Sequence, residues 1–89
     1  MLEQNLDNMI ASVEQQLTLV KIKLKNTKKD LKQLKNMVKD TVYLDMDRIQ
    51  KDEVKLSKEI SELDLRIYKL NKILYRLRVC RNILNNEDI

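Results

Sequence analysis

Apolar residues recur along the chain at intervals of three and four residues. This spacing lines them up on one side of an α-helix and is typical of the seam between packed helices. A first series spans residues 2–38 and takes one extra four-residue step between Val13 and Leu17, which predicts a stutter that locally unwinds a supercoil. Its members are Leu2, Leu6, Met9, Val13, Leu17, Val20, Leu24, Thr27, Leu31, Leu34 and Val38.

A second series, displaced by one residue from the first, spans residues 56–84. Between the two series, Asp47 and Gln50 resemble a capping box at the start of a helix. The pattern therefore predicts one all-α domain over residues 1–89, with a helix at about 2–41, a turn at about 42–46 and a helix at about 47–86. The members of the second series are Leu56, Ile60, Leu63, Ile67, Leu70, Leu74, Leu77 and Leu84.

A single continuous helix is the alternative to this hairpin. Val38, Val42, Met46 and Ile49 keep apolar residues at four-four-three spacing across the expected turn, and the chain contains neither glycine nor proline. Such a helix would form a rod of about 125 Å in an antiparallel coiled-coil dimer, whereas a hairpin would be about 60 Å long, at a rise of 1.5 Å per residue. We favour the hairpin because the register change and the capping box coincide.

Charge alternates along the chain and favours antiparallel pairing in both arrangements. Residues 1–20 carry three acids and no base, whereas residues 21–39 carry eight lysines and one acid. Residues 40–64 then carry eight acids and four bases, and residues 65–81 carry six bases without an acid. Pairing centred near residue 44 places opposite charges against each other, whereas parallel pairing would put the lysines against their own copies.

The second half of the chain has apolar residues on a wider part of its helix surface than a seam between two helices requires. Residues outside the main series would be buried only by additional neighbours, so we expect the hairpin to pack into a larger helical bundle. The additional helices would come from a second copy or from a different protein. The secondary interface predicted in this way consists of Leu65, Ile73, Cys80 and Ile83, together with Val79.

Three polar residues occupy positions where the seam predicts an apolar one: Thr27, Glu53 and Arg81. Polar residues at such positions fix register and orientation at some cost in stability. For Arg81 the hairpin predicts an ion pair with an acid of the facing helix, either Glu3 or Asp7. The alternative is that its guanidinium extends into water.

The composition argues against an enzyme or a cofactor site. Without histidine the commonest general base and the usual zinc sites are absent, and without glycine there is no phosphate-binding loop. The acids Asp45, Asp47, Asp52 and Glu53 lack the spacing and the turn glycine of a calcium loop. One cysteine, no signal-peptide pattern and no long apolar run predict an intracellular protein, cytoplasmic or nuclear, without a transmembrane segment.

The sequence thus predicts a structural or interaction protein, a coiled-coil assembly or scaffold subunit that acts through helix–helix packing. The alternative is a helical protein that binds nucleic acid through its lysine-rich face in residues 21–39, although stacking aromatics are scarce and the net charge is only +4. Tyr68 and Tyr75 share a helix face, where we expect them to pack at the edge of a bundle; the alternative is a docking surface for acidic or nucleic-acid partners. The possible nucleic-acid contacts are Lys21, Lys25, Lys28, Lys29, Lys32 and Lys35.

Overall fold

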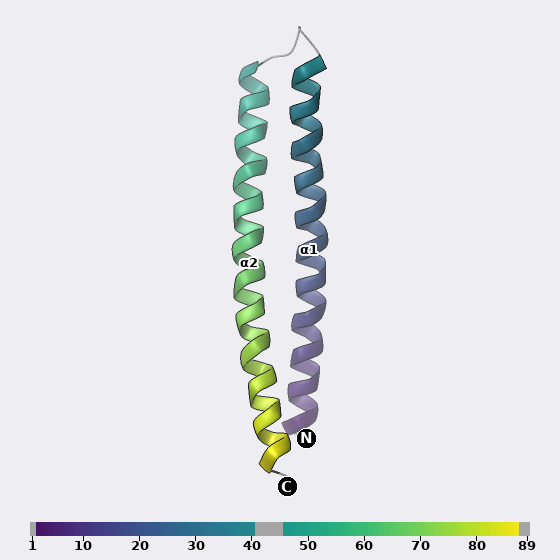
Figure 1. Cartoon of the computed structure of the whole chain (residues 1–89), viewed down its shortest axis with the longest axis vertical. Coiled ribbons are helices and arrows are strands. Elements are labelled where there is room, and N and C mark those ends of the chain that lie inside the picture. Colours follow the sequence, from purple (N-terminus) through teal and green to yellow (C-terminus); the bar gives the residue numbers. More distant parts are fainter. Residues whose placement is uncertain (1, 41–45, 88–89) are drawn as a thin grey trace.

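The computed structural model describes residues 2–40 and 46–87, and for residues 38–40 and 87 it describes the backbone only. Two long helices account for this part of the chain, α1 (Leu2–Asp40) and α2 (Met46–Glu87) (Figure 1). The turn expected at about 42–46 lies outside the described residues, except that Met46 begins α2.

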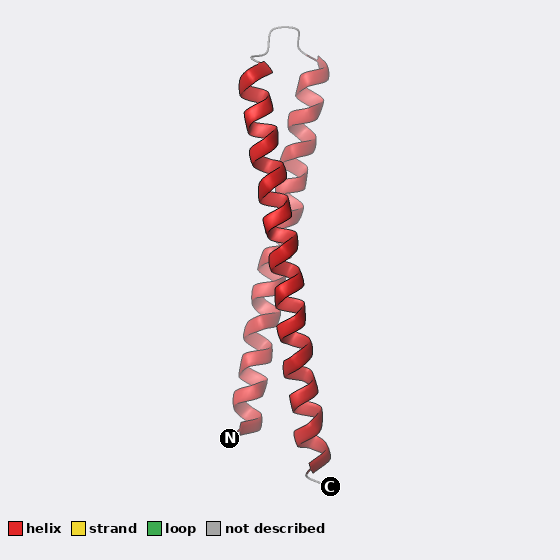
Figure 2. Ribbon diagram, turned by 90° about the vertical axis from the view of Figure 1, so that its left-hand side faces the viewer, coloured by secondary structure: helices red, strands yellow, loops and turns green. Residues whose placement is uncertain are grey.

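The two helices run antiparallel and pack against each other along their length (Figures 1 and 2). The molecule measures 70 × 15 × 14 Å, and the start of α1 and the end of α2 lie at the same end of it. We call this the open end. This arrangement confirms the predicted all-α hairpin, and the alternative of one continuous helix is wrong.

Local sequence explains why both segments are helical. Neither contains glycine or proline, and each begins with an acid in its first turn, Glu3 in α1 and Asp47 in α2. An acid at this position interacts favourably with the positive end of the helix dipole. α2 begins at Met46, next to Asp47, and the capping box of Asp47 and Gln50 stays a prediction because residues 41–45 lie outside the described part of the chain.

The buried and half-buried residues of the seam follow one another at alternating steps of three and four residues, without interruption. Ile10, which the sequence series omits, packs against the core, whereas Met9 and Leu2 are exposed. The expected stutter between Val13 and Leu17 is therefore absent. The seam comprises Leu6, Ile10, Val13, Leu17, Val20, Leu24, Thr27, Leu31 and Leu34 of α1, and Ile49, Glu53, Leu56, Ile60, Leu63, Ile67, Leu70, Leu74, Leu77, Arg81 and Leu84 of α2.

The best-packed part of the seam lies between the middle of the hairpin and its open end. Leu17 and Val20 of α1 pack there with Leu63, Leu70 and Leu74 of α2 in one buried cluster. Even so, no large side chain in the described part of the chain is completely enclosed. A two-helix seam covers one side of each helix only, so the remaining sides of both helices face outward.

Candidate helix-packing interface

The residues predicted for the packing interface whose side chains are described lie on the two facing sides of α1 and α2. Leu17, Val20, Leu63, Leu70 and Leu74 are buried, and the side chain of Val38 lies outside the described residues. The others are half-buried: Leu24, Leu31, Leu34, Leu56, Ile60, Ile67, Leu77 and Leu84.

Two seam residues escaped the sequence series, Ile10 and Ile49. Ile49 is buried, and Ile10 is half-buried against the core cluster. Both residues can be found by following the alternating three- and four-residue steps from the buried part of the seam back towards the start of each helix. From Leu17 it leads through Val13 to Ile10, and from Leu56 through Glu53 to Ile49.

Ion pairs between the helices define the two flanks of the seam. Arg78 donates a hydrogen bond to Glu14 over 3.2 Å on one flank. Lys23 lies 3.9 Å from Glu59 on the other. In a coiled coil, residues separated by whole seven-residue repeats share a flank. We therefore refer to the Glu14–Arg78 flank and the Lys23–Glu59 flank.

Arg81 forms an ion pair with Asp7 across the open end of the hairpin. This confirms the ion pair predicted from the sequence and selects Asp7 over Glu3. The midpoint of this pair is residue 44, as is that of the Lys35–Glu53 pair, whose charged atoms are 4.0 Å apart. The antiparallel register is therefore centred where the charge pattern placed it.

The polar seam residues differ in what they can specify. Arg81 and Glu53 reach charged partners on the opposite helix, so they contribute to register. Thr27 is buried, but its hydroxyl donates to the carbonyl oxygen of Lys23 over 2.8 Å, within the same helix. Because the hydroxyl donor is satisfied locally, Thr27 can be buried at little cost in stability. This hydrogen bond lies within α1, so it does not fix the register between the two helices.

The exposed pairs beside the seam should contribute little to stability. Replacing Lys23 by alanine is expected to lower the free energy of unfolding by less than about 1 kcal/mol, because both side chains of the Lys23–Glu59 pair are accessible to water. Urea unfolding followed by circular dichroism measures this. The difference should shrink further at high salt, and a loss above about 2 kcal/mol would show a tighter contact than this pair makes.

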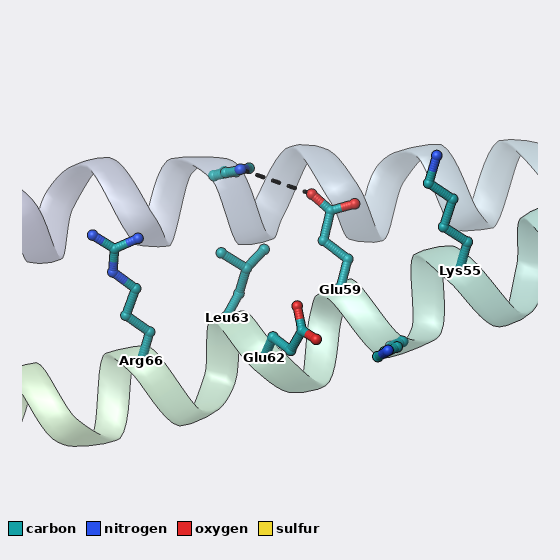
Figure 3. A pocket seen from close by; sticks show the side chains of 7 residues that line it. Lys55, Glu59, Glu62, Leu63 and Arg66 are labelled. Carbon is teal, nitrogen blue, oxygen red and sulfur yellow. Dashed lines mark ion pairs between the residues drawn. The ribbon is translucent and has the colours of Figure 1, made fainter.

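A hollow beside the seam is lined by four basic and two acidic side chains, so it is basic overall. Glu59 and Leu63 point from α2 towards α1, where Glu59 meets Lys23 (Figure 3). The hollow, of about 420 Å³, is lined by Lys23, Lys55, Lys58, Glu59, Glu62, Leu63 and Arg66. No group of three or more potential metal-ligating side chains occurs within the described part of the chain.

The four residues of the predicted secondary interface are all exposed in the hairpin, but they do not form one stripe. Ile73 and Cys80 lie two and three repeats from Glu59, so they share the Lys23–Glu59 flank with Leu2 and Met9 of α1. Ile83 follows Cys80 by one turn and borders the same patch. Leu65 lies on a different side of α2.

The candidate lysines lie along one side of α1. Lys21, Lys28 and Lys35 follow Glu14 by whole repeats and therefore share its flank. Lys25, Lys29 and Lys32 continue this row towards solvent, and all six are exposed. The row is about 21 Å long at 1.5 Å per residue. It is kept apart from the apolar patch of Leu2, Met9, Ile73 and Cys80 on the other flank.

Comparisons with known proteins find no family model, no curated protein and no solved structure that matches the chain. In the described part of the chain, no helix is both long and apolar enough to span a membrane.

Proposed function

We propose that this protein is a non-enzymatic assembly subunit whose exposed helix faces pack against helices of other subunits. The observation that carries the proposal is the set of large apolar side chains exposed outside the seam, several of them on α2. Among these, Leu65, Ile73 and Ile83 are each about half exposed in the hairpin. Residues of this kind are more often buried in folded proteins.

The hairpin by itself buries few apolar side chains. Only six apolar residues of the described chain are buried: Leu17, Val20, Ile49, Leu63, Leu70 and Leu74. Covering an additional half-exposed leucine or isoleucine would add on the order of 1 kcal/mol. A few such contacts are comparable with the whole stability of a small domain, so assembly and folding support each other.

The apolar patch at the open end offers one surface for such packing. It combines Leu2 and Met9 of α1 with Ile73 and Cys80 of α2, all exposed and all on the Lys23–Glu59 flank. A neighbouring helix laid along this flank would cover residues from both helices at once. The hairpin would then become part of a three- or four-helix bundle.

Molar mass and unfolding, measured over a range of protein concentrations, test the proposal. We expect either an oligomer heavier than the 10.7 kDa chain or a weakly stable monomer whose unfolding temperature rises with concentration. Replacing Ile73 by glutamate should reduce the self-association of an oligomer, since this side chain is exposed in the hairpin. A well-folded monomer at micromolar concentration, with an unfolding temperature independent of concentration, would contradict the proposal.

A further inference from the structure

Two open hollows on the surface of α2 are framed by residues at the spacing that receives a side chain of another helix. One is framed by Asp47, Gln50, Lys51 and Val54 and has a volume of about 470 Å³. The other, of about 360 Å³, is framed by Tyr68, Asn71, Lys72 and Tyr75, with Arg76 beside them. Both sets follow the spacing i, i+3, i+4 and i+7. In packed helices, four residues so arranged surround the knob side chain of a partner helix.

The two hollows lie on the same side of α2. Tyr68 follows Asp47 by 21 residues, which is three whole seven-residue repeats. Several apolar residues lie on this side of the helix, which we call the outer face of α2. Its apolar members are Val54, Leu65, Tyr68, Tyr75 and Val79, all exposed.

The tyrosines provide the broadest contact surface of the outer face. Tyr68 is 56% exposed and Tyr75 is 70% exposed. The ammonium of Lys72 lies 4.7 Å from the ring centroid of Tyr68, so this lysine lies along the face beside the ring. Aromatic side chains presented in this way are common anchors of protein interfaces.

Lysines lie within the outer face. Lys51, Lys58 and Lys72 are spaced by whole repeats and share one row with Leu65 and Val79. On the opposite border, Gln50 and Asn71 lie whole repeats from Arg78, so the hollows open towards the Glu14–Arg78 flank, where α1 carries its row of lysines. A helix seated in the hollows would lie against Lys51, Lys58 and Lys72 and beside the lysine row of α1, and it would meet one acid of the linings, Asp47.

We infer that the outer face of α2 binds an acidic amphipathic helix of another protein. Apolar residues of that helix fill the two hollows, and its Asp and Glu side chains face the lysines of the outer face and the lysine row of α1. This inference rests on the proposed function and specifies one partner for it. It also gives the lysine row a role in partner selection, because complementary charges favour one partner and repel others.

A second copy of this chain fits the outer face less well. A second copy is itself basic, with a net charge of +4, and carries eight lysines in residues 21–39, so it complements the lysines of the outer face less well than an acidic helix does. Nucleic acid is also less suitable, since Val54, Leu65 and Val79 offer aliphatic contacts that a phosphate backbone does not use.

The experiment uses the full chain and two labelled synthetic peptides of four heptads. Both peptides carry the same leucine seam, but one has glutamate and the other lysine at the positions beside the seam. Binding is measured by fluorescence anisotropy at two salt concentrations. We expect the acidic peptide to bind, more weakly at high salt, and the basic peptide not to bind.

Matched variants locate the binding surface. Tyr68→Ala combined with Tyr75→Ala should weaken binding of the acidic peptide by about tenfold or more, since two interface anchors are lost. Leu19→Ala, on α1 and outside both the outer face and the apolar patch, should leave it unchanged. Because all three side chains are exposed, circular dichroism should show the same helix content in each variant.

Several outcomes would overturn the inference: no binding of the acidic peptide, equal binding of both peptides, or no effect of the double tyrosine variant. Binding of labelled duplex DNA or single-stranded RNA that Lys28→Glu abolishes and the double tyrosine variant leaves intact would assign the lysine row to nucleic acid instead. If the acidic peptide fails to bind but the chain self-associates, the proposed function stands without this partner. If the chain is a stable monomer that binds neither peptide, both fall.

Discussion

Replacing Leu74 by alanine is expected to lower the free energy of unfolding by about 2–4 kcal/mol, a large part of the stability of so small a domain. Leu74 is the most buried apolar residue of the hairpin, at 5% exposed, and belongs to the cluster with Leu17 and Leu70. Truncation would remove apolar contacts and leave a gap in the seam. Urea unfolding followed by circular dichroism, with both proteins at the same concentration, measures the change.

Leu19→Ala is the matched control, because it makes the same chemical change at a side chain that is 60% exposed. We expect a loss below about 1 kcal/mol, since surface substitutions away from special contacts have small effects. If the two variants were equally destabilised, the seam assigned from burial would be wrong. If neither were destabilised, Leu74 would not be part of a packed core.

The seam was largely predictable because a repeated three- and four-residue spacing has few interpretations other than a helical interface. Its weakest part was the first two turns, where Leu2 and Met9 compete with Ile10 for the same role. Both choices give acceptable helical spacing locally. Ile10 is selected only if the alternation of three- and four-residue steps continues unbroken to Leu17. The sequence series did not apply this requirement, and it therefore predicted a stutter that the structure does not contain.

Register was predictable for a different reason. The acidic first segment and the basic last segment allow only a narrow range of antiparallel alignments, and Arg81 had to meet an acid near the start of α1. Asp7 is preferred over Glu3 because Asp7 lies on the flank of Glu14, one whole repeat away. The sequence alone could not make that choice while the seam in the first turns was misassigned.

The hollows on α2 could not be predicted from spacing alone. The sequence shows that Tyr68 and Tyr75 share a face, but a seven-residue spacing fits a solvated edge as well as a packing site. Placing them required knowing which side of α2 faces α1. Once that side is fixed, the tyrosines lie away from the seam, and the lysines of α1 lie on the flank towards which their hollow opens.

Reversing the charge of Arg81 is expected to cost about 2 kcal/mol of unfolding free energy, because Arg81→Glu would place two carboxylates against each other at a half-buried seam position. Asp7→Arg alone should be less harmful, since that side chain is about half exposed. In the double variant the pair is restored with its charges exchanged. We therefore expect the double variant to recover at least about half of the summed losses, measured as the coupling energy of a double-mutant cycle.

The same exchange at Glu14 and Arg78 is the control for this cycle. Both of those side chains are at least half exposed, so their coupling should stay below about 1 kcal/mol and fall with added salt. The coupling between Asp7 and Arg81 should be larger and less sensitive to salt, because Arg81 sits within the seam. Coupling energies of equal size, or a double variant no more stable than Arg81→Glu alone, would show that the pair at the open end does not set the register of the two helices.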